Sequence, residues 1–235
     1  MADLRLAFDT STPVGSVAVG RGRQVLAHAE LTADARHAET LLPAVDALLA
    51  RAGIEARALE GVVLGGGPGS FTGVRIAAAT ARGMVRALGI PLHVHSSLLA
   101  LAAAPGPALP VGSVCALLDA RRGQVYAGCW RFAQDRLPET VLAPCVAPVE
   151  EVLGRVEELL GLRAEDGVTW VGQGATRYAA ELRAAGIEPG PERHPSARAL
   201  LALTALDPAA SRVADPAAWE PEYLRSSGAE RGVRG

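Results

Sequence analysis

The sequence contains no lysine and no asparagine, so all 23 of its basic residues are arginine. Without lysine, neither Schiff-base catalysis nor a phosphate-loop lysine is available. A GC-rich coding bias accounts for the excess of arginine, which is therefore no sign of a phosphate-binding surface. The formal net charge of −2 gives no reason to expect strong nucleic-acid binding by this chain alone.

Cysteine is scarce and charge is absent from one long segment. The three cysteines, Cys115, Cys129 and Cys145, form no CxxC motif and are typical of reduced thiols in a cytosolic protein. Residues 87–118 contain no Asp, Glu, Lys or Arg, but several prolines interrupt them. The N-terminus enters a strand pattern directly, without a signal sequence. We therefore expect a cytoplasmic protein with no membrane contact.

The order of predicted elements occurs twice along the chain. Leu4–Phe8 ends on Asp9, two further strands and a helix follow, and the strand at residues 61–64 runs into the glycine-rich segment Gly65–Gly73. In the second half, the strand at residues 114–118 ends on Asp119, and the later strand at residues 168–171 runs into Gly172. Near-equal spacing of these landmarks predicts two copies of a βββαβα unit.

The duplication predicts an α/β protein of two lobes. We place the N-terminal lobe at residues 1–104 and the C-terminal lobe at residues 105–206, joined by a proline-rich linker at residues 104–110. The tail at residues 207–235 is polar apart from the aromatic residues Trp219 and Tyr223, which indicates that it docks back on the first lobe. We expect the last ten residues to be disordered.

Two acidic turns in duplicated units resemble the actin-like ATPase architecture, in which such turns face a cleft and hold the phosphates of ATP. The turn after Asp9 has no glycine before Gly15, which disfavours a phosphate grip. The segment Gly65–Gly73 opens a helix that could hold an anion, or its glycines could simply permit a tight turn capped by Ser70 or Thr72. The candidate nucleotide or anion contacts are Asp9, Thr10, Ser11, Gly69, Ser70 and Thr72.

Histidine spacing does not favour a metal site. Leu41 stands four residues after His37, where a helical metal pair requires a second histidine. His93 and His95 share one face of a predicted strand and need a third ligand to bind metal. We therefore predict no metal site and no catalytic residue.

Five motifs in order resemble the TsaB family, also called YeaZ. The most distinctive is Gly67–Arg75, which reads GPGSFTGVR. The others are Asp9–Thr12, His37 with Leu41–Pro43, Asp119–Arg121 with Tyr126, and Glu220–Arg225. The resemblance covers the whole chain apart from its last few residues.

This resemblance implies an actin-like (ribonuclease H-like) fold and a role in forming N6-threonylcarbamoyladenosine (t6A) in tRNA. It implies a non-catalytic subunit that pairs with the catalytic TsaD, is joined by the ATPase TsaE, and forms a homodimer when alone. We expect tRNA contact only through the complex, no tightly bound cofactor, and ATP or ADP only in the complex. The alternative is an ATP- or metal-dependent enzyme in its own right, either a transferase or a glycoprotease-like peptidase.

Helices predicted at residues 37–52 and 72–88 are the expected association face. The first carries an apolar stripe at helical spacing, and the second places small residues four apart, which lets another helix approach closely. Packing on the chain's own sheet explains the same periodicity, and the sequence alone does not decide between them. The residues predicted to form this face are Leu41, Leu42, Val45, Leu48, Leu49, Gly73, Ala77 and Ala81.

Overall fold

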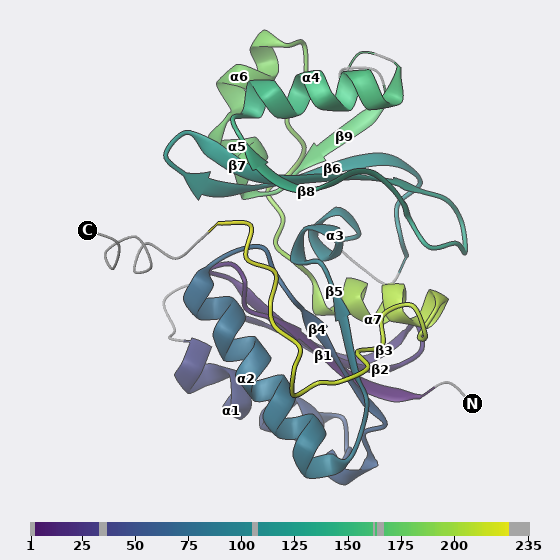
Figure 1. Ribbon diagram of the computed structural model, residues 1–235. Helices are drawn as coiled ribbons and strands as arrows, with labels where there is room; N and C mark the ends of the chain where they lie inside the picture. Colours follow the sequence, from purple (N-terminus) through teal and green to yellow (C-terminus); the bar gives the residue numbers. More distant parts are fainter. Residues whose placement is uncertain (1–2, 33–36, 105–107, 162, 164–166, 226–235) are drawn as a thin grey trace.

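The computed structural model describes residues 3–32, 37–104, 108–161, 163 and 167–225. The predicted disorder of the last ten residues lies outside these ranges, as does part of the predicted linker. The chain forms two α/β halves stacked on one another (Figure 1).

The first half is built on a five-stranded sheet with the strand order β3-β2-β1-β4-β5. Its strands are β1 (Leu4–Asp9), β2 (Gly15–Arg21), β3 (Gln24–Leu31), β4 (Gly61–Gly65) and β5 (Leu92–His95). β1 pairs antiparallel with β2 and parallel with β4. The central strands β1 and β4 are buried throughout, because helices cover both faces of the sheet.

Helices α1 (His37–Arg51) and α2 (Phe71–Leu88) cover the outer face of this sheet. The Ser70 hydroxyl caps α2 by accepting from Gly73 N at 3.3 Å, and Gly89 ends the helix in the left-handed conformation. The short 3-10 helix η1 (Ala56–Ala58) lies between α1 and β4.

The second half repeats this topology in a four-stranded sheet with the order β8-β7-β6-β9. Its strands are β6 (Gly112–Arg121), β7 (Gln124–Phe132), β8 (Glu139–Ala147) and β9 (Val168–Val171). β6 pairs antiparallel with β7 and parallel with β9, as β1 does with β2 and β4. Helices α4 (Val149–Leu160), α5 (Gln173–Arg177) and α6 (Ala179–Ala184) complete this half. The predicted duplicated α/β fold is confirmed.

Two helices lie between the sheets (Figure 1). α3 (Ser97–Ala102) follows β5 in the chain but contacts β6 and β7 of the second sheet. α7 (Ala197–Leu206), placed by the sequence in the second lobe, contacts β1, β2 and β4 of the first sheet. Each helix therefore packs across the predicted division, and the lobes at residues 1–104 and 105–206 stay a prediction.

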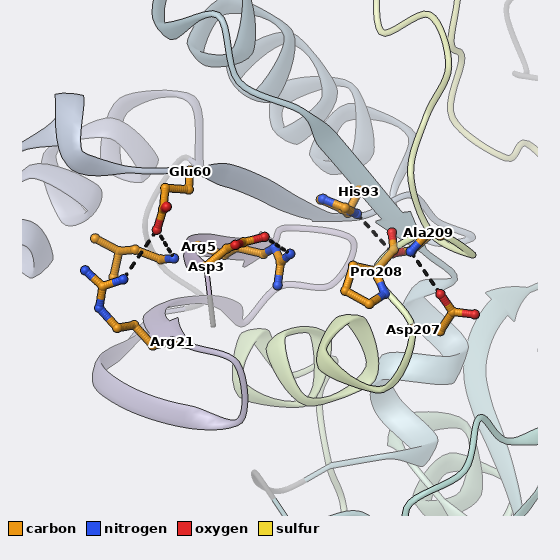
Figure 2. Close-up of polar contacts among 10 residues, drawn as sticks. Asp3, Arg5, Arg21, Glu60, His93, Asp207, Pro208 and Ala209 are labelled. Carbon is orange, nitrogen blue, oxygen red and sulfur yellow. Dashed lines mark hydrogen bonds and ion pairs between the residues drawn. The ribbon is translucent and has the colours of Figure 1, made fainter. Parts of the chain in front are cut away.

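The segment after α7 runs back along the first half (Figure 1). Ser211 and Val213 exchange backbone hydrogen bonds with β5, and Glu222 N donates to Gly66 O at 3.0 Å. Trp219 packs against the core of the first half. At the start of this segment, a ring nitrogen of His93 contacts the Pro208 carbonyl (Figure 2).

Candidate functional site

The two halves enclose a cleft of about 1080 Å³. Both predicted turns line it, the first through Ser11 and Thr12 and the second through residues 119–122. The start of α2 and residues 222–225 of the C-terminal segment line the remaining sides. The cleft therefore brings together the motifs that the sequence placed far apart.

The carboxylate of Asp9 is enclosed in protein and does not line the cleft. Asp9 is 1% exposed; its oxygens accept hydrogen bonds from Ser11 N at 2.7 Å, Ser11 Oγ at 2.6 Å and Ser97 Oγ at 2.7 Å. Burial raises the pKa of this carboxyl, although the hydrogen bonds from Ser11 and Ser97 oppose the rise. Because this carboxylate is buried and lies outside the lining of the cleft, the predicted contact of Asp9 with a nucleotide or anion gains no support from the structure and stays a prediction.

The glycines of the segment Gly65–Gly73 allow close packing of the chain on itself. A Cβ on Gly69 or Gly73 would clash with the backbone oxygens of Ser11 and Thr10 respectively. A Cβ on Gly67 would lie 2.9 Å from Glu222 O, in the C-terminal segment. Of the two readings of this segment, the structure supports the tight turn.

The remaining predicted anion contacts join this turn to α2. Thr10 Oγ1 donates to Gly73 O at 2.7 Å, and Ser70 N donates to Ser11 O at 2.7 Å. Ser70 Oγ is used as the helix cap, whereas Thr72 is exposed at the cleft. Thr10 and Ser70 are thus engaged within the protein, Thr72 remains open to the cleft, and the contact of these residues with a nucleotide or anion stays a prediction.

The carboxylate of Asp119 in the second turn is also paired within the protein. Asp119 forms an ion pair with Arg177 at 3.3 Å and accepts hydrogen bonds from Arg121 N and Tyr178 Oη. Arg121 and Arg122, which follow it, are exposed at the edge of the cleft. The sequence placed Arg121 in a family motif but gave neither arginine a role.

The structure also corrects the predicted association face. Leu41, Val45, Leu48 and Leu49 of α1 are at most 4% exposed and pack in the core between α1, α2 and the first sheet. On α2, Gly73, Ala77 and Ala81 are buried as well. Only Leu42 of the predicted set is available to a partner, at 50% exposure.

The outward side of α2 carries a different row of small residues. Ala79, Gly83 and Ala87 are exposed and lie four residues apart, so they share one face. A Cβ on Gly83 would meet nothing within 4 Å. This row has the same four-residue spacing as Ala77 and Ala81 and lies two positions further along the helix.

His37 is held by the first turn. Its Nε2 lies 2.9 Å from Thr12 O, and because a carbonyl only accepts, Nε2 carries the proton. Its Nδ1 is buried without a partner among the described residues. In those same ranges, no three His, Cys, Asp or Glu side chains gather as a possible metal ligand set.

His93 and His95 anchor the C-terminal part of the chain to β5. His93 contacts the Pro208 carbonyl and lies with Nδ1 3.2 Å from Ser211 Oγ (Figure 2). Thr204 Oγ1 donates to Leu200 O at 2.9 Å, so it accepts from His95 Nε2 at 2.9 Å. The structure assigns both histidines a positioning role for residues 200–211.

The side chain of His95 should make the stability of the fold sensitive to acid. Burial lowers its pKa from 6.5 to about 4, so between these values the unfolded chain binds a proton that the folded chain does not. Stability therefore falls as the pH is lowered. His95 alone should lower the free energy of unfolding by about 2 kcal/mol between pH 7.5 and pH 5. His95→Gln keeps an N–H donor but does not titrate, so denaturant melts should show a smaller loss over that interval. An unchanged loss would refute this assignment.

Comparisons with known proteins find relatives that are named for t6A biosynthesis. The family model for TsaD, tRNA N6-adenosine threonylcarbamoyltransferase, matches residues 25–177. The TsaB protein of Haemophilus influenzae is 38% identical over 52% of this chain and 51% of its own length. The Escherichia coli TsaB is 32% identical over 70% of this chain and 71% of its own. The chain spans about half the length of the first curated relatives it matches.

Solved structures match over nearly the whole chain. A Pseudomonas aeruginosa protein described as similar to peptidase YeaZ superposes with a TM-score of 0.81 at 31% identity, covering 96% of this chain and 100% of that one. YeaZ from the same organism gives a TM-score of 0.77 at 30% identity, covering 95% and 100%. No helix within the described ranges has the length and apolar composition needed to cross a bilayer.

Proposed function

Because the chain belongs to the TsaB (YeaZ) family, we propose that it is a non-catalytic subunit of the machinery that makes t6A in tRNA, and that it pairs with TsaD. The names of the relatives and the TsaD family model support a place in t6A biosynthesis. The partners proposed are TsaD and the ATPase TsaE, with self-pairing of this chain in their absence.

The observation that carries the non-catalytic role is the internal engagement of the first turn. Asp9 is enclosed by Ser11 and Ser97, and the glycines beside it contact protein backbone. A group must reach a reacting atom to act as acid, base or metal ligand. The Asp9 turn and the following loop are therefore proposed to stiffen the fold, and ATP or ADP is expected only in the assembled complex.

The outward sides of α1 and α2 are proposed as the pairing surface. Leu42 is half exposed on α1, and Ala79, Gly83 and Ala87 leave space for a partner helix on α2. The two helices contact each other on the same face of the sheet (Figure 1). Small side chains let helix backbones approach closely, and an exposed leucine gains by burial.

Reconstituted threonylcarbamoyl transfer tests this proposal. Purified chain, TsaD, TsaE, tRNA and the activated donor are combined, and each protein is omitted in turn. We expect no transfer when TsaD is omitted and a large loss when this chain is omitted. Transfer by this chain without TsaD, or full transfer without this chain, would contradict the non-catalytic role.

A further inference from the structure

The β6–β7 turn carries two exposed arginine side chains at the edge of the cleft. Arg121 and Arg122 are both exposed and both adopt left-handed backbone conformations, with φ of 62° and 55°. Neither side chain forms a hydrogen bond or ion pair with any residue in the described ranges. The neighbouring Asp119 is already paired with Arg177. The structure therefore shows no counter-charge for these two guanidinium groups among the residues that it describes.

The C-terminal segment brings a third arginine to the same turn. Arg225 Nη1 donates to Ala120 O at 2.6 Å, which places its guanidinium beside the backbone that carries Arg121 and Arg122. All three arginines line the cleft, where the carboxylates are those of Asp119 and Glu222. With Asp119 paired to Arg177, the edge formed by Arg121, Arg122 and Arg225, here called the arginine edge, is positively charged.

Aromatic rings stand in the same cleft. Phe71 and Tyr223 pack with their centroids 5.2 Å apart, and the Arg75 guanidinium lies 3.7 Å over the Phe71 ring. Tyr223 is 38% exposed, and Tyr126 of β7 lines the cleft as well. Guanidinium groups that track phosphates, combined with rings on which bases stack, are typical of sites for single-stranded nucleic acid.

We infer that the arginine edge binds phosphates of single-stranded RNA, with an unstacked base received by the aromatic rings of the cleft. This inference rests on the proposed function, in which the RNA is the tRNA substrate. The inference depends on where these three arginines lie at the cleft, and not on the excess of arginine in the sequence. RNA suits the site better than a free nucleotide, because the exposed edge is open while the loop that would cradle a triphosphate is packed against the Thr10–Ser11 turn.

The test uses the assembled complex of this chain with TsaD and measures tRNA binding by fluorescence anisotropy at several salt concentrations. Arg121→Ala combined with Arg122→Ala should weaken binding on the order of tenfold and reduce the slope of log K against log salt by about 1.4, since each phosphate contact in a single strand contributes about 0.7. The matched control is Arg136→Ala with Arg212→Ala, which removes the same charge from two exposed positions that do not line the cleft. The control should bind tRNA as the wild type does.

The outcomes separate this inference from the proposed function. The affinity of the wild-type chain for TsaD is measured first. If the wild-type chain does not bind TsaD, the proposed function fails. The same variants are then compared for RNA binding by the isolated chain. Unchanged RNA affinity and salt slope in the Arg121/Arg122 variant would overturn the inference. So would loss of TsaD binding in that variant, which would make the edge a protein contact. ATP is titrated without RNA, and saturable binding that the variant loses, with RNA binding intact, would assign the edge to free nucleotide.

Discussion

Replacing Gly73 with alanine should destabilise the chain by more than about 3 kcal/mol, at the upper end of the cost of overpacking. The new Cβ would overlap the backbone oxygen of Thr10. That oxygen has little freedom to move, because hydrogen bonds hold the residues on either side of it. Thr10 Oγ1 donates to Gly73 O, and Ser11 O accepts a hydrogen bond from Ser70 N. The melting temperature should fall by about 10 °C for a chain of this size.

The same substitution ten residues further along α2 is the matched control. Gly83 is also within the helix, but a Cβ there meets nothing within 4 Å. Alanine has a higher helix propensity than glycine by about 1 kcal/mol, so Gly83→Ala should raise the melting temperature by a few degrees. If Gly73→Ala melts within about 2 °C of the wild type, the packing of the glycine-rich turn is not what stabilises the fold.

The second large effect is expected on pairing. Gly83→Leu places a bulky side chain on the outward face of α2 without disturbing the core. In a close helix contact, overpacking of about 1–3 kcal/mol corresponds to a roughly tenfold to hundredfold loss of affinity. Affinity for TsaD and self-association should both decrease, as measured by analytical ultracentrifugation, while the melting temperature stays near that of the wild type.

Ala77→Leu provides the opposite pattern. Ala77 lies on the side of α2 that faces the core and is fully buried, so the larger side chain should lower the free energy of unfolding by about 1–3 kcal/mol. The folded fraction should still bind TsaD. If Ala77→Leu blocks pairing in a stable protein and Gly83→Leu does not, the pairing surface lies elsewhere than on the outward face of α2.

Sequence patterns predicted much of the fold. The repeated order of strands and the helix after Gly65–Gly73 are present, and of the two cap candidates, Ser70 and Thr72, Ser70 is the cap, because local turn chemistry and apolar periodicity determine these features. The positions of α3 and α7 between the sheets were not predicted. α3 packs on the two strands that follow it and α7 on strands from the start of the chain, and local periodicity does not say which sheet an apolar face will meet.

The candidate site was predicted less well for the same reason. The apolar stripe of α1 and the row through Ala77 are real, but a stripe that packs on its own sheet has the same spacing as one that binds a partner. The environment of Asp9 depends on Ser97, which is 88 residues away in the chain. The sequence does not show that Asp119 pairs with Arg177, and this ion pair is what leaves the positive charges of Arg121 and Arg122 notable.

The proposed pairing with TsaD is tested most directly by a calorimetric titration of this chain into purified TsaD. We expect saturable binding of one chain per TsaD, which Gly83→Leu weakens and Gly83→Ala affects much less. Absence of binding between the two folded proteins at every concentration reached would contradict the proposed pairing.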